Sequence, residues 1–184
     1  MAIIGLGNPG PEYEGTRHNA GYRVMEALAR ELSASRPFRL QKSICATTVY
    51  AGSRLILVQP VTYMNLSGQA VAELFRHYRL AVNNLLLIHD ELDLPLGTLR
   101  FKSGGSSAGH QGVQSVIDSL GNSEFLRLRF GIGRPLLTEE TVDYVLETFT
   151  HLEQEMVEST VGTAIIAIKL LIREGLVAAM NRFN

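Results

Sequence analysis

The chain has 184 residues, of which 46% are hydrophobic and 19% charged, and these values are typical of one globular domain with its own core. The formal net charge of −1 excludes a strongly basic protein, so a polyanion would have to bind at a local patch of cations. The single cysteine, Cys45, excludes an intrachain disulfide, and we expect it to be buried because it lies in the β-like run ICATTVY.

Strands and helices are expected to alternate along the chain. In chain order the pattern predicts a strand over residues 1–5, a helix over 20–34, strands over 44–52 and 54–60 joined by a turn at Gly52 and Ser53, a helix over 65–80, strands over 84–91 and 98–103, a helix over 110–121, a strand over 126–133, and helices over 141–149 and 151–175 in a stretch that is helical from Glu139 on.

The character of these elements predicts the fold class. Val24, Leu28 and Leu32 share one helical face, and the continuous apolar run over residues 84–91 is typical of a central strand covered on both faces. No composition break or repeat divides the chain. We therefore expect a single α/β domain over residues 1–184, with a twisted mixed sheet flanked by helices on both faces.

The sequence also predicts where the protein works. The N-terminus lacks a charged segment followed by an apolar run, which argues against a secretory signal. The most apolar stretch, AIIAIKLLI, is short and interrupted by Lys169, which argues against a membrane span. We expect a soluble cytoplasmic protein with no membrane partner.

Residues 5–10, GLGNPG, match the spacing G-x-G-x-x-G of a dinucleotide-binding loop. In such a loop a helix begins at the glycines and points its N-terminus at the pyrophosphate. Here proline and glycine follow, and no helix is expected before Asn19, which is placed to cap it. We therefore interpret the segment as a loop after a strand, in which glycines permit close approach and Asn8 offers a donor and an acceptor.

Polar side chains occur at the ends of several expected strands. His18 lies just before the first helix, Asn65 begins the helix after the strand over 54–60, and Asp90 lies where the apolar strand over 84–91 reaches the surface. Each residue taken alone fits an ordinary structural role, such as a helix cap or a turn. Ligand sites of α/β sheets lie at strand ends, so together they predict a site in which Asp90 orients His18.

A second group of residues indicates a place for an anion. The glycine- and serine-rich loop over residues 102–112 opens a helix at His110, and free backbone amides at a helix start are typical of anion sites. Arg100 and Lys102 alternate on one strand and so share a face. With Arg129 they would form a small basic patch on an otherwise neutral protein.

The motifs GLGNPG, TRHNAG, TYMNLSG, HDELDLPLG, GGSSAGH and RLRFGIGRP, in this order, resemble those of the bacterial peptidyl-tRNA hydrolase family. The resemblance extends from Ile3 to the closing GLVAAMNR, and so many motifs in one order make it specific. It implies a monomeric cytoplasmic enzyme that hydrolyses the ester between peptide and tRNA in peptidyl-tRNA released prematurely from ribosomes, with no metal or cofactor.

The resemblance also implies a role for each matching position. His18 matches the catalytic base and Asp90 the carboxylate that orients it, and we expect the Asn65 amide to donate to the reacting carbonyl. The peptide and the acceptor end of tRNA would contact Asn8, Tyr13, Tyr63, Met64, Asn65, His110 and Gln111. The phosphates of tRNA would contact Arg100, Lys102 and Arg129.

The chain departs from the family pattern at one position of the expected site. The family's GHNG reads GHQG here, so Gln111 replaces an asparagine and moves the amide outward by one methylene. We expect reduced but surviving activity, because the longer side chain is less well preorganised. The basic residues are also few, which predicts weak affinity for tRNA. The alternatives are a catalytically weakened RNA-binding relative of the same fold and, from GLGNPG alone, a dinucleotide enzyme.

Overall fold

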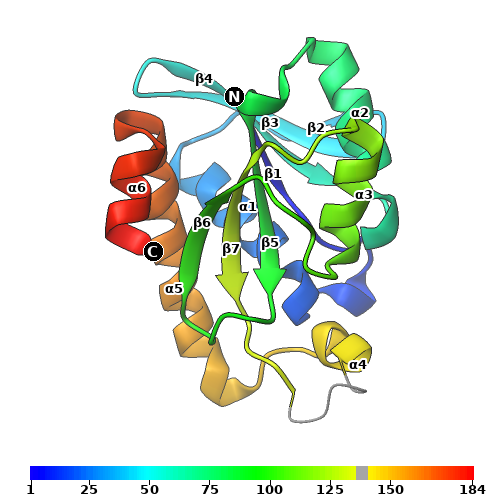
Figure 1. Ribbon diagram of the computed structural model, residues 1–184, viewed down its shortest axis with the longest axis vertical. Helices are drawn as coiled ribbons and strands as arrows, with labels where there is room; N and C mark the ends of the chain where they lie inside the picture. The colour runs from blue at the N-terminus through cyan, green and yellow to red at the C-terminus, as the bar shows by residue number, and fades with distance from the viewer. Residues whose placement is uncertain (136–140) are drawn as a thin grey trace.

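A seven-stranded mixed sheet forms the centre of the computed structural model, which describes residues 1–135 and 141–184 (Figure 1). The strand order is β2-β3-β4-β1-β5-β7-β6. The strands are β1 (Ala2–Gly5), β2 (Phe38–Leu40), β3 (Ser43–Tyr50), β4 (Ser53–Pro60), β5 (Leu85–Glu91), β6 (Leu99–Ser103) and β7 (Leu126–Gly131).

Helices cover both faces of this sheet. They are α1 (Ala20–Glu31), α2 (Ser67–Tyr78), α3 (Gln111–Leu120), α4 (Thr141–Leu146), α5 (His151–Glu174) and α6 (Leu176–Phe183), with short 3-10 turns η1 (Pro11–Tyr13), η2 (Arg17–Asn19), η3 (Met64–Leu66) and η4 (Val82–Asn84). None of the helices in residues 1–135 and 141–184 is both long and apolar enough to cross a membrane.

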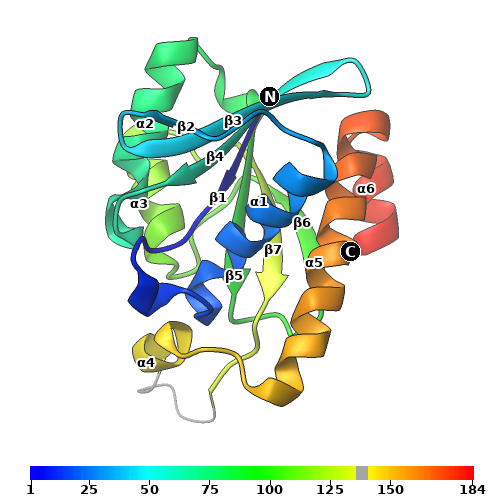
Figure 2. The same cartoon turned by 180° about the vertical axis from the view of Figure 1, so that it is seen from behind.

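Alternation along the strands divides the apolar side chains between two cores. Ile3 and Ile88 point to the face on which α1, α5 and α6 pack, whereas Ile4 and Leu87 point to the face covered by α2 and α3. Figure 2 shows α1 lying over the sheet with α5 and α6 beside it. Burial on both faces explains why β5 is apolar without interruption before its polar end.

Four adjacent strands bring their carboxyl ends to the same edge. β4, β1, β5 and β7 are mutually parallel neighbours, whereas β2, β3 and β6 join by antiparallel pairing. The loop after β1, the turn after β4 and the end of β5 therefore meet, and α4 lies at this edge (Figure 1). Such an edge is where open α/β sheets bind ligands.

The predicted fold class, an α/β domain with a mixed sheet between helices, is confirmed. The turn predicted at Gly52 and Ser53 is wrong by one residue, since Ser53 pairs with Tyr50 and the turn is Ala51–Gly52. Ala51 and Gly52 have φ angles of 49° and 78°, the left-handed conformations that a tight hairpin requires. Glu139, from which helix was predicted, lies outside the described residues.

Glycines in the GLGNPG loop permit the close approach of α1. A Cβ on Gly5 would lie 2.3 Å from the carbonyl oxygen of Gly21, and one on Gly7 would lie 2.7 Å from the ring of Tyr22. The segment continues into η1 and η2, and α1 begins only at Ala20. The glycines therefore serve helix–strand packing here, and the helix that follows the loop does not begin at the glycines as it does in a dinucleotide site.

Candidate active site

A cleft of about 540 Å³ opens at the carboxyl ends of the parallel strands. Every residue proposed from the sequence for catalysis or for binding the peptide and acceptor end lines it: Asn8, Tyr13, His18, Tyr63, Met64, Asn65, Asp90, His110 and Gln111. They come from the loop after β1, η1, η2, the turn after β4, the end of β5 and the start of α3. Segments far apart in sequence thus form one concave site.

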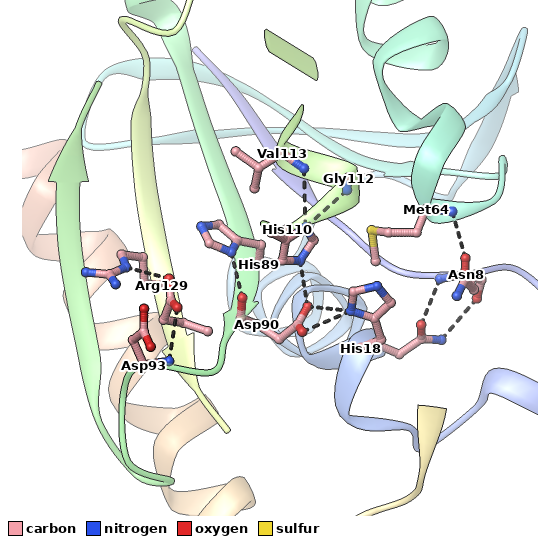
Figure 3. A network of polar contacts seen from close by, with 12 residues as sticks. Asn8, His18, Met64, His89, Asp90, Asp93, His110, Gly112, Val113 and Arg129 are labelled. Carbon is pink, nitrogen blue, oxygen red and sulfur yellow. Dashed lines mark hydrogen bonds and ion pairs between the residues drawn. The ribbon is translucent and has the colours of Figure 1, made fainter. Parts of the chain in front are cut away.

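His18 and Asp90 are in direct contact in this cleft (Figure 3). Nδ1 of His18, in η2, lies 3.0 Å from Oδ1 and 2.9 Å from Oδ2 of Asp90, at the end of β5. The Asp90 side chain is only 2% exposed and that of His18 13% exposed. A carboxylate facing Nδ1 holds the proton on that nitrogen and leaves Nε2 as the ring's basic nitrogen.

His110 is a second hydrogen-bond donor to the same carboxylate. Its Nε2 lies 2.9 Å from Oδ1 of Asp90, and its ring lies beside that of His18, with the two centroids 5.0 Å apart (Figure 3). Its Nδ1 accepts the backbone N–H groups of Gly112 at 3.1 Å and Val113 at 3.3 Å, so the proton of the neutral ring must be on Nε2. This contact was not predicted, since the sequence gives no sign that His110 faces Asp90.

Burial and charge set the protonation of this cluster. Burial by itself opposes the charged form of Asp90, but the two imidazoles outweigh it and hold the pKa of Asp90 well below its usual range. Burial would likewise lower the pKa of His18, but the charge of Asp90 and the hydrogen bond to it raise that pKa. The neighbouring His89 is buried and beside His110, which lowers its pKa to about 3 and keeps it neutral.

The ligand atoms of His18, Asp90 and His110 lie within 4.8 Å of one another, a spacing that also suits a metal ion. Nδ1 of His110 already accepts two backbone amides, however, and its Nε2 carries a proton towards Asp90. Metal binding would require removing that proton or reversing the tautomer against both amides. The donor set therefore fits a hydrogen-bonded cluster better than a metal centre.

Asn8 and Asn19 form a paired support under the cleft. The backbone N–H of Asn8 donates to Oδ1 of Asn19 at 2.7 Å, and Nδ2 of Asn19 donates to the Asn8 carbonyl at 3.0 Å. The prediction that Asn19 caps the first helix is therefore wrong, because its side chain is used here. Oδ1 of Asn8 accepts the N–H of Met64 at 2.7 Å, so Nδ2 is the group that Asn8 can offer to a ligand.

The remaining cleft residues surround this buried floor. Asn65 and Gln111 are exposed, and Asn65 lies in η3 rather than at the first position of α2. The rings of Tyr13 and Tyr63 meet edge to face with their centroids 6.3 Å apart. Exposed amides and aromatic rings offer hydrogen bonds and apolar contact to an extended chain.

The proposed phosphate-binding residues lie on β6 and β7, outside the lining of the cleft. Arg100 and Arg129 face each other in the antiparallel pair, and Arg100 and Lys102 share a face of β6. Nε of Arg129 lies 2.8 Å from Oε2 of Glu91, so its charge is already compensated. The amides at the start of α3 are likewise used in part, because two of them donate to His110.

Four apolar residues that line the cleft were not predicted, and they form what we call its apolar wall. Leu92 and the α4 residues Val142, Val145 and Leu146 line the cleft. A helix was predicted over residues 141–149, but nothing in the sequence placed it beside His18. The lining of the cleft is therefore partly polar and partly apolar.

Comparisons with known proteins relate the whole chain to one family. The profile of the family described as peptidyl-tRNA hydrolase matches residues 2–184. A peptidyl-tRNA hydrolase of Moorella thermoacetica is 44% identical over all of this chain and 97% of its own length, and one of Carboxydothermus hydrogenoformans is 45% identical over 99% and 97%. The crystal structure of the Acinetobacter baumannii peptidyl-tRNA hydrolase superposes with a TM-score of 0.94 at 36% identity, covering 100% of this chain and 93% of that one.

Proposed function

The chain belongs to the peptidyl-tRNA hydrolase family, and from this premise we propose how it hydrolyses the ester that joins a peptide to tRNA. The observation that carries the proposal is the contact between His18 and Asp90 inside a cleft whose other lining residues are neutral except for Glu91 and Arg134. An ester is activated enough for attack by an oriented water molecule, so a covalent nucleophile is not required.

His18 acts as the general base. Its neutral Nε2 accepts a proton from water while the water oxygen bonds to the ester carbonyl carbon, and negative charge develops on the carbonyl oxygen. The Asn65 amide donates a hydrogen bond to that oxygen. The intermediate then collapses, the bond to the ribose oxygen breaks, and the His18 imidazolium returns the proton to that oxygen. The products are free tRNA and a peptide carboxylic acid, which ionises to the carboxylate by releasing its proton to water.

Asp90 supports both protonation states of His18. Before the proton transfer it accepts Nδ1–H and so fixes the tautomer with a free Nε2. After the transfer its negative charge stabilises the imidazolium, in agreement with the raised pKa of His18. Because Asp90 is almost fully buried, water does little to screen this interaction.

The cleft binds the peptide through groups that contact its backbone, whatever its side chains are. Nδ2 of Asn8 and the amides of Asn65 and Gln111 hydrogen-bond the peptide backbone, and Met64, Tyr13, Tyr63 and His110 supply contact area. Backbone recognition favours an N-blocked peptidyl group over a free aminoacyl group and tolerates any side chain. Release should therefore depend little on the peptide sequence.

Arg100, Lys102 and Arg129 bind phosphates of the tRNA in this proposal. Since Glu91 neutralises Arg129, Arg100 and Lys102 supply most of the attraction, and tRNA affinity should be modest and should fall as salt rises. We also propose that residues 1–184 act as one domain, as a monomer in the cytoplasm, and without a cofactor.

The test is hydrolysis of N-acetyl-aminoacyl-tRNA by the wild-type chain and by His18→Ala. Wild-type turnover that the substitution abolishes supports the proposal. The alternative, a catalytically weakened RNA-binding relative, is favoured only by Gln111 and predicts tRNA binding without hydrolysis in either protein. Equal rates in the two proteins would exclude His18 as the base.

A further inference from the structure

Arg17, the residue before His18, is buried, and both terminal nitrogens of its guanidinium are paired, whereas Nε has no hydrogen-bond partner among the described residues. Its guanidinium binds Glu153 of α5 with two hydrogen bonds, of 3.0 and 2.9 Å, and its side chain is only 5% exposed. The guanidinium carbon lies 4.4 Å from the ring centroid of Tyr144 and 4.9 Å from that of Phe149. Bidentate pairing and stacking together are specific to arginine and unavailable to lysine.

These partners all belong to the segment that carries the apolar wall of the cleft. Tyr144 lies in α4, Phe149 follows it, and Glu153 lies in the first turn of α5. The backbone joins the same segment, since Arg17 N–H donates to the Glu147 carbonyl at 2.9 Å. Arg17 thus makes the central attachment between η2 and this segment, beside a backbone bridge of Thr16 with Thr148 and the contacts of Arg23 with Phe149 and Gln154.

α4 depends on this attachment more than His18 does. The helix has only six residues, none of them fully buried, and its apolar anchorage is limited to Tyr144 and Val145, which pack against the edge of the core. The Tyr144 hydroxyl donates to the Ile132 carbonyl at 2.7 Å, but it belongs to the same ring that Arg17 stacks on. His18, by contrast, has its own anchor in Asp90, and the adjacent Asn19 is paired with Asn8.

We propose that Arg17 is a positioning residue for substrate binding: it holds the α4 wall, with Val142, Val145 and Leu146, against the turn that carries His18. This inference rests on the proposed function, because it concerns the peptide-binding side of the same cleft. Its consequence is a separation of roles between neighbours in sequence. Arg17 sets KM through the wall, whereas His18 performs the proton transfer and sets kcat.

The experiment compares Arg17→Met, Arg17→Lys and the control Lys169→Met in hydrolysis of N-acetyl-aminoacyl-tRNA. Lys169 also joins the N-terminal part of the chain to α5, through a 2.6 Å ion pair with Glu31, but lies away from the cleft. Arg17→Met should raise KM about tenfold with kcat changed by no more than about twofold, because uniform binding is lost and the chemistry is kept. Arg17→Lys should give a smaller rise, and Lys169→Met should leave both constants unchanged.

Two further measurements separate the possible outcomes. The acid limb of the pH profile should stay in place in Arg17→Met, and in a His18→Ala background the same substitution should weaken substrate binding by the same factor as KM. A lower kcat with unchanged KM, a shifted acid limb, or no change in either constant would overturn the inference. If Arg17→Met does not fold, Glu153→Gln must raise KM alone. Failure of the proposed function would be seen separately, as absence of wild-type turnover.

Discussion

Asp90→Asn should remove most of the activity by changing which nitrogen of His18 carries the proton. His110 is a fixed donor towards position 90, because its Nδ1 already accepts the amides of Gly112 and Val113. The oxygen of the new amide must therefore face His110, and its NH2 group takes the place of Oδ2, 2.9 Å from Nδ1 of His18. An N–H at this position favours the tautomer with a bare Nδ1 and a protonated Nε2, which is no longer a base.

The size of the effect follows from the same geometry. The equivalent exchange beside the histidine of a serine-protease triad lowers kcat about 10⁴-fold through the wrong tautomer. Here Oδ1 also lies 3.0 Å from Nδ1 of His18, so the new oxygen retains some attraction for the productive tautomer. We therefore expect kcat to fall about 10³-fold, which corresponds to about 4 kcal/mol of transition-state stabilisation.

A double variant tests whether the wrong tautomer of His18 is the cause of the fall in kcat. In Asp90→Asn/His110→Ala the imidazole that holds the amide oxygen of the new asparagine is gone. That amide can therefore rotate, so that its oxygen accepts Nδ1–H of His18. The double variant should be about tenfold faster than Asp90→Asn under single-turnover conditions, although His110→Ala alone slows the wild type. A double variant slower than Asp90→Asn would refute the tautomer argument.

Three other predictions address pH, the unusual glutamine and helix packing. Asp90 raises the pKa of His18, and only the neutral ring accepts a proton. The value of kcat/KM should therefore fall as the pH drops through a value above about 6.5. An acid limb of the pH profile centred at or below that value would contradict this. Gln111→Asn should raise kcat, whereas a slower variant would mean that the site is built around glutamine. Gly68→Ala puts a Cβ 1.9 Å from the Ser115 carbonyl oxygen and should cost about 2–3 kcal/mol of unfolding free energy, whereas Gly162→Ala, with open space around it, should stabilise by up to about 1 kcal/mol in the same denaturation assay.

Most of the fold could be predicted because its signals are local. The continuous apolar run before Asp90 and the spacing of Val24 and Leu28 indicate burial directly, and both elements form as expected. The strand β2 and the exact turn at Ala51 were not predicted. β2 is only three residues long and largely exposed, and the hairpin register depends on backbone conformations that Ala51 and Gly52 adopt only when their strands pair.

The residues of the site were predicted better than the hydrogen bonds that connect them. Motif order placed His18, Asp90 and Asn65 in one site, and they line one cleft, but their catalytic roles stay predictions until the variants are measured. An asparagine before a helix usually caps it, and this pattern predicts a capping role for Asn19. The nearby Asn8 backbone competes for the same amide, and no local pattern reveals that competition.

The amino-acid sequence by itself determined the alternation of strands and helices, the family, and the kinds of side chain at the strand ends, because these depend on periodicity and local composition. Only the tertiary structure decided which side chains meet. The parallel order of β4, β1, β5 and β7 brings residues 18, 90 and 110 together, turns His110 into a second donor to Asp90, and pairs Arg129 with Glu91. Hydrogen-bond partners are selected by distances of a few ångströms in space, and a one-dimensional pattern does not contain those distances.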